Sequence, residues 1–187
     1  MTDRARAADA IEAFLAALGL DSALVPELRD TGRRVADAFA DDFLRGYRSD
    51  PAALLRGSLV EATTEVVVVR GLAVTTMCPH HLLLAEGTAT VAFAPRGKAV
   101  GLGALVAVVG TLAARLVLQE SLGEDVVSLL QAELEPRWVA CRLVLRHGCM
   151  TGRGERAHGS TVETLATRGL EAPHERADAL RIVLGAA

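Results

Sequence analysis

Aromatic residues are scarce in this 187-residue chain, at 3%, although hydrophobic residues make up 51% of it. The core is therefore expected to consist of small aliphatic side chains, and this proportion of core-forming residues excludes a disordered chain. Basic residues are not in excess, because 20 Lys and Arg stand against 23 Asp and Glu, for a net charge of −3. A general nucleic-acid-binding protein needs a basic surface, so the composition argues against such a function and we expect no nucleic-acid partner.

Long apolar runs and cysteines are also few. The most membrane-like stretch, residues 99–114, is interrupted by glycines and is shorter than the roughly 18 apolar residues of a membrane-spanning helix. We interpret it as a buried strand end followed by a buried helix, and we expect no membrane partner.

The N-terminus carries no apolar signal sequence, and three cysteines cannot all pair within one chain. We therefore expect a reducing, cytoplasmic location, where a Cys near a His is more typical of a metal site than of a disulfide.

Apolar periodicity and turn residues predict an α+β domain with an antiparallel sheet. Helices are expected over residues 3–18, from about 30 to 48, over 104–122 and 124–134, and after Pro173. Crowded β-branched residues and alternating patterns predict strands at 65–69, 74–77, 88–94, 138–146 and 160–166. Residues 1–60 are expected to form an N-terminal helical segment, and residues 61–187 a single compact catalytic domain.

The densest group of reactive side chains follows a predicted strand, where Cys78 and His81 are three positions apart beside His80. A second pair, His147 and Cys149, follows another predicted strand. Two cysteines and one histidine with a fourth position open for water are typical of a catalytic zinc ion, which lowers the pKa of its water toward neutrality. The remaining histidines could then transfer protons near neutral pH. The residues alone leave open the alternative of a buried thiol and histidines that merely end strands.

Five motifs stand in a fixed order along the chain: Cys78-Pro79-His80-His81-Leu82, Gly101-Leu102, Gln119-Glu120-Ser121-Leu122, His147-Gly148-Cys149-Met150 and Arg153-Gly154. Together with residues 30–36 upstream, they resemble the motifs of the GTP cyclohydrolase I family over roughly residues 31–169. The spacing between the second and third motifs matches the family without a gap.

The resemblance implies a T-fold, with an antiparallel sheet, paired helices on one face and N-terminal helices, assembled as a homodecamer of two pentamers. It implies an enzyme that opens the imidazole ring of GTP with release of formate and forms dihydroneopterin triphosphate for folate or pterin synthesis. Zn²⁺ would be bound by Cys78, His81 and Cys149, whereas His80 and His147 would transfer protons.

The substrate-binding residues also follow from the resemblance. Glu120 would accept hydrogen bonds from the guanine N1 and amino groups, with Gln119 beside it, and would reject adenine, which lacks that arrangement. Arg153, and Arg34 from a neighbouring subunit, would contact the phosphates. Without the resemblance, Glu120 would be interpreted as a solvated charge at a helix end and each Arg as part of a surface salt bridge.

The chain departs from the family pattern where the family binds the sugar and triphosphate. Gly103, Ala104 and Ala107 replace a Ser, a Lys and a basic residue, and Pro79 replaces an acidic residue beside the metal. Each charge-assisted hydrogen bond contributes about 1.5–3 kcal/mol, so triphosphate binding is expected to weaken by orders of magnitude unless other cations take over. Three candidates for that role are Lys98, Arg115 and Arg156.

Three hypotheses therefore stay open. The first is GTP cyclohydrolase I activity with altered phosphate contacts. The second is a divergent zinc hydrolase of the same fold that acts on a purine-like compound with fewer phosphates. The third is a non-catalytic zinc-binding assembly protein, which the retained histidines disfavour because a scaffold needs no proton-transferring groups beside a metal.

Overall fold

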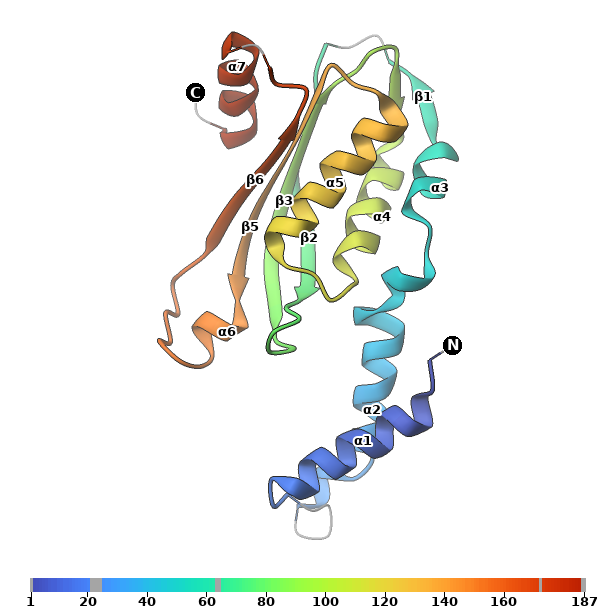
Figure 1. Cartoon of the computed structure of the whole chain (residues 1–187), viewed down its shortest axis with the longest axis vertical. Helices are drawn as coiled ribbons and strands as arrows, with labels where there is room; N and C mark the ends of the chain where they lie inside the picture. The colour runs from blue at the N-terminus through green and yellow to red at the C-terminus, as the bar shows by residue number, and fades with distance from the viewer. Residues whose placement is uncertain (1, 21–24, 63–64, 172, 186–187) are drawn as a thin grey trace.

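A four-stranded antiparallel sheet forms the body of the protein, and N-terminal helices project from one end of it (Figure 1). The structure is a computed structural model that describes residues 2–20, 25–62, 65–171 and 173–185. The sheet has the order β2-β3-β5-β6, with β2 (Val67–Met77), β3 (Leu84–Ala94), β5 (Trp138–His147) and β6 (Val162–Arg168). A second, two-stranded sheet pairs β1 (Leu59–Glu61) with β4 (Lys98–Val100).

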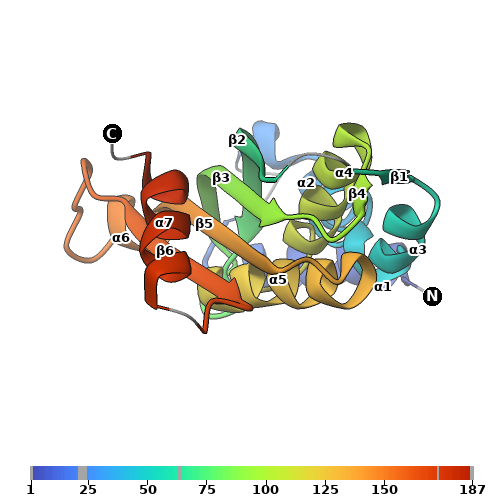
Figure 2. The same cartoon turned by 90° about the horizontal axis from the view of Figure 1, so that it is seen from above.

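Helices cover both faces of the main sheet. The pair α4 (Leu102–Ala113) and α5 (Gln119–Leu134) packs on one face, around the buried side chains of Phe93, Val126 and Leu130. The C-terminal helix α7 (Pro173–Leu184) packs on the opposite face through Ala179 and Val183 (Figure 2). The predicted α+β class, with an antiparallel sheet, paired helices packed on one face and N-terminal helices, is confirmed.

The two strands predicted at residues 65–69 and 74–77 are one strand, β2, because a β-bulge connects them. The pairing register with β3 shifts between Val69 and Leu72, and Gly71 within the bulge has a φ of 70°. A left-handed conformation costs glycine little, so the strand continues where the sequence pattern predicted a break.

The break between the paired helices lies at residues 114–118, whereas the sequence predicted it at Gly123. The connecting segment runs along the end of β2, where the Val117 N–H donates to the carbonyl oxygen of Met77 at 3.2 Å. Gly123 instead lies inside α5, and a Cβ at this position would be 3.3 Å from the Cβ of Ala166 on β6. Glycine therefore allows close packing of helix on sheet at a position where it was expected to end the helix.

The charge-free stretch over residues 99–114 is only partly buried, contrary to the expectation of a buried helix. Leu105, Val108 and Leu112 of α4 lie in the core, but Leu102 and Val106 are 62% and 52% exposed. One face of α4 thus packs on the sheet, and the other presents apolar side chains to solvent. None of the helices in the described ranges is long and apolar enough to cross a membrane.

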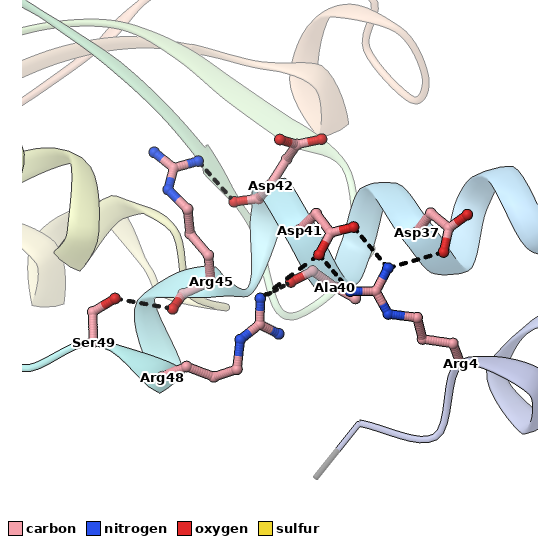
Figure 3. A network of polar contacts seen from close by, with 8 residues as sticks. All are labelled: Arg4, Asp37, Ala40, Asp41, Asp42, Arg45, Arg48 and Ser49. Carbon is pink, nitrogen blue, oxygen red and sulfur yellow. Dashed lines mark hydrogen bonds and ion pairs between the residues drawn. The ribbon is translucent and has the colours of Figure 1, made fainter.

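The N-terminal part contains α1 (Arg4–Ala17), η1 (Pro26–Leu28), α2 (Thr31–Ala38), η2 (Phe39–Phe43), η3 (Arg45–Arg48) and α3 (Pro51–Arg56). The helix expected from about residue 30 to 48 therefore changes to a π-helical and then a 3-10 turn. The carboxylates of Asp37 and Asp41 both bind the guanidinium of Arg4 from α1 (Figure 3). The hydrogen bond from Arg4 to Asp41 lowers the pKa of the exposed Asp41 carboxyl below its ordinary value of 3.8.

Close backbone contact attaches the N-terminal part to α4. The Gly46 N–H donates to the carbonyl oxygen of Ala114 at 3.0 Å, and the Arg115 Nε–H donates to the carbonyl oxygen of Gly46 at 3.1 Å. A Cβ on Gly46 would lie 2.0 Å from the carbonyl oxygen of Thr111, so only glycine fits there. This close-packed contact joins the segment before α3 to the end of α4, whereas α3 and β1 pack on the body of the protein through the buried Leu55 and the pairing of β1 with β4.

Candidate active site

A pocket of about 370 Å³ lies where β2 and β5 end and α5 begins. Six of the residues singled out in the sequence line it: Cys78, His80, Gln119, Glu120, His147 and Cys149. A larger pocket, of about 750 Å³, lies between α7 and the sheet and contains none of the predicted site residues. The smaller pocket is therefore the candidate active site.

The strand register brings the two reactive motifs together. Met77, the last residue of β2, pairs with Leu84, and the adjacent Ala85 pairs with His147 at the end of β5. The residues that follow these strand ends, Cys78 and Cys149, therefore lie beside the same pocket. Segments 70 residues apart in the sequence thus meet through β3, which pairs with both β2 and β5.

A tight turn follows β2 and carries both adjacent histidines. The Cys78 N–H donates to the carbonyl oxygen of Leu83 at 3.0 Å, and the Leu82 N–H donates to the carbonyl oxygen of Cys78 at 2.9 Å. Leu82 closes this turn with a φ of 53°, which is unusual for a non-glycine residue. Cys78 is buried, whereas His80 and His81 are exposed at the tip.

Glu120 is in the first turn of α5, exposed at the edge of the pocket. A carboxylate is stabilised at this end of a helix by the helix dipole. The same carboxylate can accept two hydrogen bonds from neighbouring donors on a planar ligand. Its position fits the predicted role in base recognition.

Gln119 is buried, with only 2% of its surface exposed. Its Nε2 lies 3.1 Å from the carbonyl oxygen of Leu143, 3.0 Å from that of Val162 and 3.1 Å from the Thr164 Oγ1. Its Oε1 lies 2.7 Å from the Nε2 of His147. Both ends of the amide, predicted to bind substrate, therefore contact the protein itself.

The chemical character of the predicted metal ligands fits zinc, because two thiols and one imidazole are typical zinc donors. Cys78 and Cys149 line the pocket, but His81 does not, and its Nε2 lies 3.3 Å from the Nη1 of Arg153. In the part of the chain that the structure describes, no three Cys, His, Asp or Glu side chains are close enough together to hold a metal ion. Two of the three predicted ligands thus line the pocket, and the third, His81, lies on the turn that follows β2.

Arg34 does not line the pocket of its own chain. Its guanidinium donates to the carbonyl oxygen of Glu27 at 3.2 Å and to the Thr31 Oγ1 at 3.0 Å, at the start of α2. A role of Arg34 at a substrate would therefore require the pocket of another subunit, as the resemblance implied.

The candidate replacement cations have different surroundings. Lys98 forms an ion pair with Glu135, beyond the C-terminal end of α5, whereas the pocket lies at the N-terminal end of that helix. Arg115 is held by the Gly46 carbonyl and stacks 5.9 Å over the Tyr47 ring. Arg156 is exposed in the loop after α6 (Gly148–Thr151). Of these three, only Arg156 shares the Arg153 loop.

The three positions that depart from the family pattern, Gly103, Ala104 and Ala107, lie in the first half of α4. The pocket lies beyond the other end of this helix. Gly103 and Ala107 are exposed, and Ala104 is half-buried. A Cβ on Gly103 would have no atom within 4 Å, so a side chain fits there. None of the three lines the pocket of its own chain.

Sequence reasoning did not single out the apolar wall of the pocket. This wall includes Ala85, Val117, Leu118 and Val162, next to Thr76 and to Met150 of the fourth motif. Val117 and Leu118 stand directly before Gln119, which is the one signal that could have identified them. Cys141, the third cysteine, lies outside the pocket in the core, where burial raises the pKa of its thiol to about 12.

Known proteins resemble this chain over nearly its whole length. The model of the family described as GTP cyclohydrolase I matches residues 7–183. A protein named GTP cyclohydrolase 1 from Leifsonia xyli subsp. xyli (strain CTCB07) is 40% identical over 184 residues, covering 97% of this chain and 95% of its own. One with the same name from Rhodopirellula baltica (strain DSM 10527 / NCIMB 13988 / SH1) is 39% identical over 190 residues, covering 99% and 81%.

Among solved structures, the apo form of the archaeosine synthase QueF-Like is 18% identical, with a TM-score of 0.47, and the match covers 58% of this chain and 97% of that one. The family match and the identity to its curated members lead to one conclusion. This chain belongs to the GTP cyclohydrolase I family.

Proposed function

We propose that this protein is a zinc-dependent hydrolase that opens the imidazole ring of GTP, releases C8 as formate and forms dihydroneopterin triphosphate. The observation that carries the proposal is the convergence of Cys78, His80, Glu120, His147 and Cys149 on one pocket. Family membership supports the same activity, because curated relatives at 35–40% identity are named GTP cyclohydrolase 1.

Each residue has a distinct part in the proposed reaction. The Glu120 carboxylate accepts hydrogen bonds from the guanine N1–H and amino group and orients the base. His147 and His80 hold or release protons at the purine and ribose as bonds break and form. Cys78, Cys149 and His81 would hold a zinc ion, which when bound supplies Lewis acidity and lowers the pKa of a water.

The active sites are proposed to lie between subunits of a homo-oligomer, a decamer of two pentamers. Two observations support assembly: Arg34 lies away from the pocket of its own chain, and α4 exposes Leu102 and Val106. Large exposed apolar side chains on one helix face are common at protein–protein interfaces. Sedimentation of the purified protein would test the decamer, and a monomer would contradict it.

The three free thiols fit the proposed cytoplasmic location.

A second candidate function is hydrolysis of a guanine compound with fewer phosphates. It is favoured by Gly103, Ala104 and Ala107, where the resembling motif has a hydroxyl and two cations. Incubation with GTP, GMP, guanosine and guanine, with formate and pterin both measured, separates the candidates. Turnover of GTP alone to a pterin supports the first, and preferential formate release from GMP or guanosine supports the second.

The triple substitution Gly103→Ser, Ala104→Lys and Ala107→Arg provides a matched test of the phosphate contacts. Two added cations are expected to lower the KM for GTP by roughly 10²-fold or more, since each charge-assisted contact contributes about 1.5–3 kcal/mol. The KM for guanosine should stay unchanged, because guanosine has no phosphate. An equal effect on both compounds would contradict the placement of these residues at phosphates.

A further inference from the structure

The side-chain amide of Gln119 has one orientation that satisfies its surroundings. An amide NH₂ can only donate and an amide oxygen can only accept. Three acceptors surround the Nε2: the carbonyl oxygens of Leu143 and Val162 and the Oγ1 of Thr164, all at 3.0–3.1 Å. The opposite orientation would place the Oε1 against two carbonyl oxygens in a site from which water is excluded, because Gln119 is 2% exposed. The Oε1 must therefore face His147.

This orientation determines which nitrogen of His147 carries a proton. The Gln119 Oε1 lies 2.7 Å from the His147 Nε2 and can only accept, so the Nε2–H must donate. In the neutral ring the Nδ1 then has the free lone pair. We propose that Gln119 is a positioning residue that fixes the orientation and the Nε2–H tautomer of His147, rather than a ligand of the substrate. The catalytic consequence rests on the proposed function, whereas the tautomer does not.

The same amide also links the residue proposed to bind the base, Glu120, with the residue proposed to transfer protons, His147. Gln119 is the first residue of α5, and Glu120 is the next residue along the helix. The bonds from the Nε2 attach this helix end to β5 and to β6, and His147 ends β5. One buried side chain therefore sets the position of the base-recognising carboxylate relative to the proton-transferring imidazole. Its loss is expected to affect the chemical step more than the affinity for GTP.

Solid-state ¹⁵N NMR of the full-length protein labelled at histidine, without substrate, tests the tautomer. The His147→Gln variant identifies the His147 signals among those of the five histidines. The wild type is expected to show a protonated Nε2 with a downfield, hydrogen-bonded proton. In Gln119→Met that proton should move upfield and the Nδ1–H form should become detectable.

A matched control is available on the same helix. Gln131 of α5 has its Nε2 3.5 Å from the Pro136 carbonyl oxygen, and its Oε1 has no hydrogen-bond partner among the described residues. Gln131→Met removes an amide from α5 without touching the pocket, and should leave the His147 signals and formate release unchanged. In Gln119→Met, kcat for formate release from GTP should fall roughly 10²-fold, the lower range for general acid–base groups, with KM changed less than about threefold.

Two results would overturn the proposal. One is an Nδ1–H tautomer of His147 in the wild type, a measurement that does not depend on any variant folding. The other is a folded Gln119→Met protein whose His147 signals match the wild type. A wild type that releases no formate from any guanine compound overturns the proposed function instead, and leaves the tautomer to be decided by NMR.

Discussion

The Nη1 of Arg153 lies 3.3 Å from the Nε2 of His81. A guanidinium can only donate, so this imidazole nitrogen accepts with the lone pair that a metal ion bound there would use. A residue predicted to contact phosphate and a residue predicted to bind metal thus share one hydrogen bond. A metal ion bound at this nitrogen would replace the hydrogen bond to Arg153, so we expect the two predicted sites to be coupled through this contact.

Arg153→Met is expected to raise the KM for GTP roughly 10- to 100-fold through loss of a charge-assisted contact, and to leave zinc content unchanged. Zinc is measured by elemental analysis and KM by pterin fluorescence. Arg146→Met, which removes an exposed arginine 3.9 Å from Glu86 on the sheet, is the control and should change neither value. Loss of zinc from Arg153→Met would contradict the coupling, since it would make Arg153 a support for His81.

Glu120→Gln is expected to lower kcat/KM for GTP by about 10²-fold or more, because the amide NH₂ opposes the guanine donors and leaves them partly unpaired. Asp125→Asn, which neutralises another exposed carboxylate of α5, should keep wild-type kinetics. A Glu120→Gln enzyme with unchanged selectivity for GTP over ATP would show that another group recognises the base.

Metal removal is expected to expose two of the three cysteines to alkylation. Cys78 and Cys149 line the pocket, whereas Cys141 is buried with a thiol pKa raised to about 12. Since the thiolate is the reactive form, Cys141 should stay unmodified in the folded protein with or without chelator. Mass spectrometry of iodoacetamide-treated protein should show chelator-dependent labelling at Cys149 and Cys78. Equal labelling of Cys149 with and without chelator would argue against its role as a ligand.

The ion pair between Arg4 and Asp41 predicts a specific pH dependence for the N-terminal helices. The hydrogen bond lowers the pKa of Asp41 in the folded state, so its stabilisation is fully present above pH 3.8 and is lost as pH falls through the folded pKa. Asp41→Asn should lower the melting temperature at pH 7 by no more than about 4 °C, because the pair is exposed. This difference should shrink in strong acid. A difference that stayed constant down to pH 2 would contradict the ion-pair explanation.

Short sequence motifs predicted the reactive side chains of the pocket, but they did not predict which residues these side chains contact. Cys78 and Cys149 were identified from motifs, and their approach to one pocket was a consequence of the strand register. The role of Gln119 could not be predicted, because its partners on β5 and β6 lie 24 to 45 residues away.

Element boundaries failed where tertiary contacts overrode local signals. Gly123 is a helix-breaking signal in isolation, but close packing against Ala166 retains it inside α5. Leu102 and Val106 were expected in a core because an uninterrupted apolar stretch does not show which of its side chains face the sheet and which face away from it.

The proposed function requires this chain to open the imidazole ring of GTP with a metal ion held by Cys78, His81 and Cys149. GTP labelled with ¹⁴C at C8, incubated with the zinc-loaded protein, tests it most directly. One labelled formate is expected for each GTP consumed, together with a fluorescent pterin after oxidation, and both products should be lost in Cys149→Ser. Absence of labelled formate from the zinc-loaded wild type, or full activity in Cys149→Ser, would contradict it.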